Sequence, residues 1–136
     1  MPAELYPWMH LMGRILFTLI FVMSGLTGHI FNMKGSVAYA EMKGAPAPKV
    51  LVPVTGVMIA VGGALVLLGW HRFIGAGLLV IFLIPVSYYM HAFWKVSDPM
   101  MKANEMAHFM KNMSMLGAAL VIAFYAGDPW PLSVGP

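Results

Sequence analysis

Four apolar runs, each long enough to cross a lipid bilayer, divide this sequence. They cover residues 8–31, 50–70, 73–94 and 105–126. The hydrocarbon core of a bilayer is about 30 Å thick, and a helix of roughly 20 apolar residues spans it. Because lipid offers no hydrogen-bond partners, a chain that crosses it repeatedly folds each crossing into a helix or closes a barrel. The lengths of these runs predict four transmembrane helices.

The connections between the runs predict how the helices are joined. Only His71 and Arg72 separate the second and third runs, which predicts a tight antiparallel hairpin. The middle of residues 32–49 is typical of a short interfacial helix, and residues 95–104 carry a turn signal at Asp98-Pro99. We therefore expect an all-α integral membrane protein, a four-transmembrane-helix bundle with a short interfacial segment between helices 1 and 2. Residues 1–136 then form a single membrane domain.

Small residues recur along the first three runs. Helices in lipid associate by close packing, which small side chains permit. The pattern predicts helix contacts at Ser24, Gly25, Gly28, Gly56, Gly62, Gly63, Gly75 and Gly77.

Composition supports a membrane location and excludes several function classes. The chain is 60% hydrophobic and only 10% charged, whereas soluble domains carry about 25% charged residues. The lipid bilayer is therefore an expected partner. The absence of cysteine excludes disulfides and thiolate metal sites. Basic residues are scattered singly, which argues against nucleic acid. The abundant methionines lie mostly on the apolar runs, where they pack, and no metal site is expected.

Lysine positions predict the orientation in the membrane. Cytoplasmic loops of membrane proteins carry an excess of Lys and Arg. One side of the predicted bundle holds only Arg14 and Arg72, whereas the other holds Lys34, Lys43, Lys49, Lys95 and Lys102, with Lys111 close by. We expect both longer loops in the cytoplasm and both termini outside.

Lys111 is the most conspicuous polar residue in a predicted span. It lies about six residues into the fourth run, or ~9 Å from its start. A charge at the bilayer centre costs roughly 2.5–3.5 kcal/mol. Two interpretations remain open. The side chain either snorkels to the headgroups as an anchor, or it meets polar partners at the same depth.

Polar partners for Lys111 are available on the third predicted helix. His91 lies near the end on the same side, with Tyr88 and Trp94 three residues away in either direction. On the fourth helix, His108 and Asn112 accompany Lys111 on one face. If the two faces meet, they form a polar pocket that can bind and protonate a quinone-like carbonyl or a small anion. Residues of the first loop that can cover it are Tyr39 and Glu41.

Arg14 lies at the opposite membrane face. One interpretation is that it snorkels and pairs with Glu4 or Asp128. The other is a contact with a partner protein or with lipid.

Four motifs in order resemble the DoxX family. They are GRILFTLIFVMSGL (13–26), GAPAPKVLVPVTGV with VGGALVLLGWHR (44–72), IPVSYYMHAFW (84–94) and FMKNMSMLGAAL (109–120). Two positions depart from the family pattern: Ile59 stands where many members carry a glutamate, and Gly135 stands where many carry an aspartate.

The resemblance implies a small four-helix protein of the bacterial inner membrane. Some relatives are linked to thiosulfate oxidation with electron delivery to quinone, and others to oxidative-stress complexes. Its characteristic polar positions match Arg14, His91, Trp94, Lys111 and Asn112.

Three functions follow as hypotheses. The first is a redox-associated membrane subunit that acts with other subunits, has no intrinsic cofactor and has a quinone as its candidate ligand. The second is a non-catalytic accessory subunit packed against a larger complex or against its own copies. The third, a small-molecule or lipid transporter, is less favoured because four helices without a repeat are too few unless the protein oligomerises. Catalysis by this chain alone is not expected, and no residue is assigned as catalytic.

Overall fold

The computed structural model describes residues 2–135, which are helical or irregular throughout. The principal helices are α1 (Tyr6–Met23), α2 (Met33–Met42), α3 (Pro48–Leu68), α4 (Arg72–Met90) and α5 (Pro99–Phe124). Shorter helical turns are η1 (Ala3–Leu5), η2 (Ser24–Phe31), η3 (Phe93–Lys95) and η4 (Tyr125–Gly127). Four helical segments are long and apolar enough to span a membrane: Ala3–Phe31, Pro48–Leu68, Arg72–Lys95 and Pro99–Gly127. The predicted fold class is confirmed, and α2 is the predicted interfacial helix.

Two helix limits in the structure differ from the limits of the apolar runs. The last long helix begins at Pro99 rather than at Glu105, because Asp98 caps it by accepting a hydrogen bond from the Met101 amide at 2.8 Å. Hydropathy marks where the apolar run begins, whereas the cap determines where the helix begins. Within the third span, Arg72–Lys95, the regular helix α4 ends at Met90, and His91 has non-helical backbone angles.

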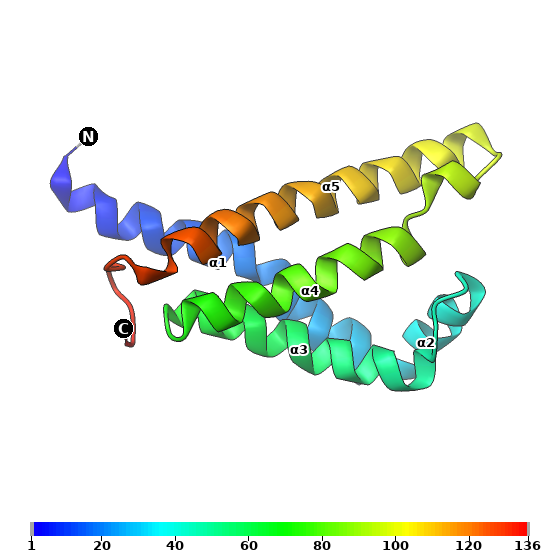
Figure 1. Ribbon diagram of the computed structural model, residues 1–136, viewed down its shortest axis with the longest axis horizontal. Coiled ribbons are helices and arrows are strands. Elements are labelled where there is room, and N and C mark those ends of the chain that lie inside the picture. Colours follow the sequence, from blue (N-terminus) through cyan, green and yellow to red (C-terminus); the bar gives the residue numbers. More distant parts are fainter. Residues whose placement is uncertain (1, 136) are drawn as a thin grey trace.

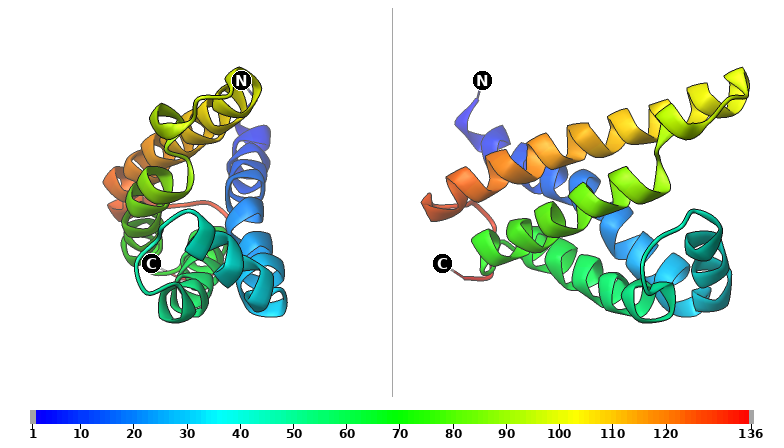
Figure 2. Two further views of the ribbon diagram at one scale, coloured as in Figure 1. Left: turned by 90° about the vertical axis from the view of Figure 1, so that its right-hand side faces the viewer. Right: turned by 45° about the vertical axis from the view of Figure 1, so that its right-hand side comes forward.

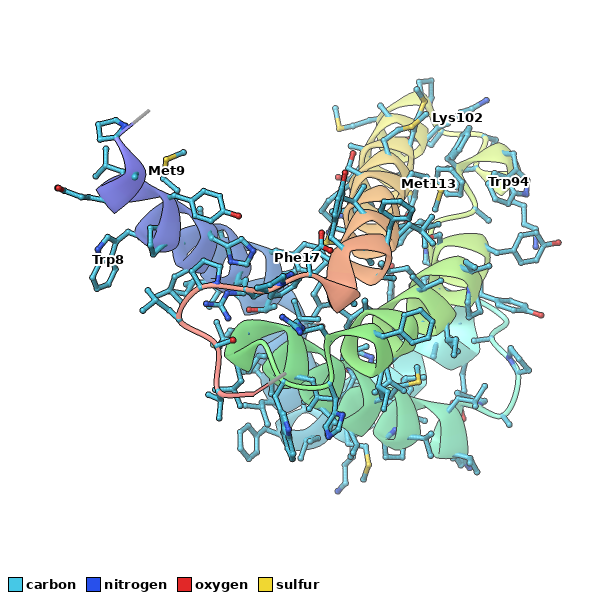
Figure 3. All side chains as sticks on the ribbon, turned by 60° about the vertical axis from the view of Figure 1, so that its left-hand side comes forward. Trp8, Met9, Phe17, Trp94, Lys102 and Met113 are labelled. Atoms are coloured by element: carbon cyan, nitrogen blue, oxygen red, sulfur yellow. The ribbon has the colours of Figure 1, made fainter. Side chains whose placement is uncertain are left out.

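The long helices form an open bundle. Figure 1 shows α4 lying between α3 and α5, and α1 packs against α3. Two views from other sides show α1 and α5 diverging from each other (Figure 2), and Figure 3 shows the same open angle, with Phe17 on α1 and Met113 on α5. The buried apolar core is formed by residues of α1, α3, α4 and α5: Phe21, Ile59, Val66, Ala76, Leu79, Leu83 and Ala119.

Glycines permit the closest helix crossings. The last part of the first span, η2, is wound as a π-helix and crosses α3 where Gly25 meets Gly56. A methyl group added at Gly25 would lie 2.6 Å from the Gly56 carbonyl oxygen, and one added at Gly56 would collide with Cβ of His29. The α3–α4 crossing is similar, because a methyl group at Gly62 would lie 3.0 Å from the Gly75 carbonyl oxygen. These four glycines were predicted as contacts. The same prediction for Gly77 is wrong, because Gly77 has open space around it.

Gly56→Ala is expected to destabilise the bundle by about 1–3 kcal/mol, because the added methyl group forces the first span away from α3. The matched control is Gly77→Ala, which adds the same methyl group to a helix in open space and should be neutral or slightly stabilising. Unfolding of both variants in mixed detergent micelles measures the difference. Equal stabilities would contradict the close crossing.

The bundle has two chemically distinct ends. The start of α1, the α3–α4 turn and residues 125–135 form the terminal end, at the left of Figure 1. The helix α2 and the α4–α5 connection lie at the opposite end, called the loop end. Each end carries its own cluster of polar residues.

Candidate functional site

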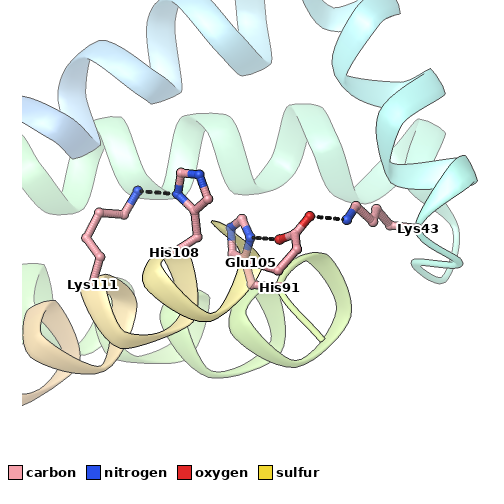
Figure 4. A network of polar contacts seen from close by, with 5 residues as sticks. All are labelled: Lys43, His91, Glu105, His108 and Lys111. Atoms are coloured by element: carbon pink, nitrogen blue, oxygen red, sulfur yellow. Dashed lines mark hydrogen bonds and ion pairs between the residues drawn. The ribbon is translucent and has the colours of Figure 1, made fainter. Parts of the chain in front are cut away.

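A buried carboxylate at the loop end joins three elements. Glu105, on the first turns of α5, is only 8% exposed. One of its oxygens, Oε2, accepts a hydrogen bond from Nδ1 of His91 at 2.8 Å, and the other accepts one from the Lys43 ammonium. Figure 4 shows the carboxylate between these two groups. Because Glu105 lies on α5 while Lys43 and His91 directly follow α2 and α4, the contact connects three helices at the loop end.

Helix ends bring Lys43 and His91 to Glu105. Lys43 is the residue that follows α2, and His91 is the residue that follows α4. Both positions leave the regular helix, so their side chains are free to turn toward α5. Charge-assisted hydrogen bonds of this kind are stronger than neutral ones.

Two further groups extend the cluster along α5. The His108 ring stacks on the His91 ring with centroids 5.1 Å apart, and Nδ1 of His108 lies 3.4 Å from Nζ of Lys111. Both side chains project from the same side of α5 (Figure 4). We call Lys43, Glu105, His91, His108 and Lys111 the loop-end array.

Exposure increases along this array. Glu105 is buried, His91 and His108 are half-buried, and Lys111 is exposed. The hydrogen bond with Glu105 raises the pKa of Lys43 above its ordinary value. The ammonium therefore stays charged near neutral pH and compensates the buried carboxylate.

Tyr88 and Trp94 do not join the array. They are 53% and 45% exposed, and their rings contact each other on the outer surface with centroids 5.8 Å apart. Lys95 lies over the Tyr88 ring. The single helical stripe predicted for these residues and His91 is not formed, because α4 ends before His91 and the chain turns into η3.

The remaining predicted pocket and loop residues lie in different parts of the structure. Asn112 is buried inside the bundle, 5% exposed, on the same face of α5 as Glu105. Tyr39 lies near the array, since the Lys43 ammonium is 5.4 Å from its ring. Glu41 lies elsewhere: it lines a separate hollow with Lys34 and Lys49. Lys43, rather than Glu41, is the loop residue that reaches the site.

Glu105 and Lys43 were not predicted as site residues. One signal was available for Glu105, because Glu105 and His108 are three residues apart and therefore share a helix face. An acid at the edge of an apolar run is also costly unless it is paired. No comparable signal marks Lys43, whose position depends on how the first loop folds over the bundle.

At the terminal end, Arg14 is 3% exposed and forms neither of the ion pairs considered for it. The ion pairs among residues 2–135 are those of Glu105 with Lys43 and His91. Instead, Nη2 of Arg14 donates to the backbone carbonyls of Pro131 and Leu132, at 3.0 and 2.8 Å. The chain after α5 thus folds back over α1.

Chemically, the loop-end array can exchange protons. It contains a buried carboxylate, two imidazoles and two ammonium groups. His91 is hydrogen-bonded to Glu105 and stacks on His108, which lies beside Lys111. Imidazole changes protonation near neutral pH, which makes it suited to passing protons. Within residues 2–135, no three His, Cys, Asp or Glu side chains gather as a metal site.

Comparison with known proteins gives one family and one curated relative. The DoxX family model matches residues 9–92. Inner membrane protein YphA of Escherichia coli strain K12 is 29% identical over 117 residues, which cover 86% of this chain and 82% of the relative. No solved structure matches. The inner-membrane relative and the four apolar spans support a multi-pass inner-membrane protein. The family match covers more than half of the sequence, and this chain belongs to the DoxX family.

Proposed function

We propose that this chain is a membrane subunit of a redox complex, in which the loop-end array supplies protons to a quinone-type carbonyl compound that arrives from the bilayer. The observation that carries the proposal is the array itself: a buried Glu105 linked through His91 and His108 to an exposed Lys111. Intramembrane ionisable groups are costly, and their usual roles are ion, proton or substrate handling.

The proposed reaction is the reduction of a quinone to a quinol. The quinone takes up two electrons and two protons. A reduced partner protein supplies the electrons and is oxidised, since this chain has no cysteine for thiol redox chemistry. Lys111 and His108 hold the carbonyl oxygens and donate protons to them, and solvent water at the loop end returns protons to this pair.

The position of Lys111 supports approach from the bilayer. Its side chain is exposed on the bundle surface rather than enclosed in a cavity. A quinone ring that diffuses in lipid can therefore reach the ammonium directly. Asn112, the next residue, is buried and faces the bundle interior, so Lys111 marks the boundary between the core and the outer surface.

We propose the orientation that the lysine distribution predicts, with the loop end in the cytoplasm and both termini outside. Protons from the cytoplasm then reach the array at its exposed end, where Lys111 is exposed and His108 is half-buried.

Lys111→Met is expected to reduce the quinone that remains bound after gentle detergent extraction by about tenfold or more, because a hydrogen bond to a charged group contributes about 1.5–3 kcal/mol. The matched control is Lys102→Met, which removes an exposed lysine from the same helix, outside the array. Mass spectrometry measures quinone per protein in the extracts.

Three results are informative. Loss of quinone in Lys111→Met but not in Lys102→Met supports the proposal. Equal quinone content in both variants and the parent contradicts it. Extraction of a stoichiometric complex in which this chain holds no quinone also contradicts it, and favours the accessory-subunit hypothesis instead.

A further inference from the structure

The terminal end holds two buried arginines with no carboxylate within ion-pair distance among residues 2–135. Arg14 is 3% exposed and Arg72 is 7% exposed. Arg72 donates to the backbone carbonyl of Asp128 at 3.0 Å, and both guanidinium groups lie over the Trp130 ring. Buried charges are normally paired with opposite charge. A bound anion would supply that charge to the two neighbouring arginines.

The free hydrogen-bond donors lie on Arg14. Its Nη2 is used by the two C-terminal carbonyls, but Nε and Nη1 are buried and have no partner among residues 2–135. Nδ1 of His10, one helical turn earlier on α1, is also buried and unpartnered in that range. His10 is held in place by the edge of the Trp130 ring, with centroids 4.8 Å apart. Nε and Nη1 can each donate one charge-assisted hydrogen bond to an anion oxygen.

A pocket of about 380 Å³ lies beside these groups. It is formed between α1, the end of α5 and the C-terminal segment, and its lining includes His10, Arg14, Tyr125, Asp128 and Trp130. This volume falls within the range of ligand-binding pockets. Asp128 is the acidic residue of the lining. It is exposed, and only its backbone carbonyl bonds to Arg72.

The geometry points to a phosphate-binding site in this pocket, in which Arg14 and His10 donate to the oxygens of a phosphate group. The site lies at the opposite end from the loop-end array and does not depend on the proposed function. A phosphate group is available from two sources at a membrane edge, an anionic phospholipid headgroup or free phosphate. Basic pockets between transmembrane helices are a recognised way of holding lipid phosphates.

The test uses the full-length purified protein and two probes. One is inorganic phosphate, compared with chloride at equal ionic strength. The other is phosphatidylglycerol in nanodiscs, compared with phosphatidylcholine. Thermal stability reports phosphate binding, and native mass spectrometry counts bound lipid. Binding of free phosphate assigns the site to a soluble ion, and selective retention of phosphatidylglycerol assigns it to lipid.

Variants identify the site without disturbing the anchored C-terminal segment. His10→Phe keeps an aromatic ring against Trp130 but removes Nδ1, and it is expected to weaken binding about tenfold. The matched control is His71→Phe, which replaces an exposed histidine at the same end whose ring contacts Trp70 at a tilt. Asp128→Asn removes the acid from the lining and is expected to tighten binding.

Three outcomes overturn the inference. Neither probe binds; or phosphate has no effect while phosphatidylcholine is retained as strongly as phosphatidylglycerol; or His10→Phe binds the probes as the parent does. It is supported if one probe binds, His10→Phe weakens it and His71→Phe does not.

Discussion

Replacing Glu105 with leucine is expected to lower the free energy of unfolding by about 3 kcal/mol, the lower end of the range for breaking a buried ion pair. The Lys43 ammonium and Nδ1 of His91 would lose their shared acceptor. The lower figure applies because the Lys43 side chain is 21% exposed and can turn partly toward water. Unfolding in mixed detergent micelles provides the measurement.

Two further variants separate the ion pair from simple packing. Glu105→Gln keeps one acceptor oxygen at the same place and should lose less stability than Glu105→Leu. The double variant Lys43→Met/Glu105→Leu also removes the Lys43 ammonium, which Glu105→Leu alone leaves without an ion-pair partner. Its stability should therefore exceed that of the single Glu105→Leu variant. If the stability losses of Lys43→Met and Glu105→Leu add up to the loss of the double variant, Lys43 and Glu105 do not interact, which contradicts the structure.

The same contact predicts a pH dependence. The hydrogen bond with Glu105 raises the pKa of Lys43 above its ordinary value of 10.5. A group whose pKa is raised by folding stabilises the protein fully below the unfolded-state pKa, and this stabilisation is lost as pH rises through the folded-state pKa. The stability difference between the parent and Lys43→Met should thus be constant at neutral pH and shrink above about pH 10.5.

Replacing Arg14 with methionine is expected to release the C-terminal segment from the bundle, at a cost of about 3 kcal/mol for two hydrogen bonds to a charged donor. The carbonyls of Pro131 and Leu132 would lose that donor. The Val134 amide, which donates to the Leu68 carbonyl at 2.9 Å, should then exchange its hydrogen faster. Hydrogen exchange read by mass spectrometry measures this.

The control for this variant is Arg72→Met, which removes a single hydrogen bond, the one to the Asp128 carbonyl. Its effect on the Val134 amide should be smaller. Unchanged exchange at Val134 in Arg14→Met would mean that Arg14 does not hold the C-terminal segment in place.

The spans were predictable because their signal is local. Each apolar run is long enough by itself to identify a membrane helix, and the polar middle of the first loop identified α2. Helix ends were less predictable because they depend on particular caps. The cap at Asp98 begins α5 early, and the break at His91 ends α4 early. That break is what separates His91 from Tyr88 and Trp94.

The candidate site was predictable only where its residues lie on regular helices. That His91 and His108 face each other was one of two open interpretations, and the structure places their rings in contact. Lys43 could not be identified because a loop of unknown path carries it. The place of Trp130 beside the two arginines was not predicted; both guanidinium groups lie over its ring. Its position depends on the C-terminal segment folding back, which no periodic pattern encodes.

The central claim is that a quinone-type compound meets the loop-end array from the bilayer. A photoreactive quinone analogue, incorporated into membranes that hold the native protein and then activated by light, tests it most directly. Peptide mapping should find the label on α5 around His108 and Lys111, and excess unmodified quinone should compete it away. Label spread evenly over the exposed apolar faces of α1 and α5, or label that quinone does not displace, would contradict the claim.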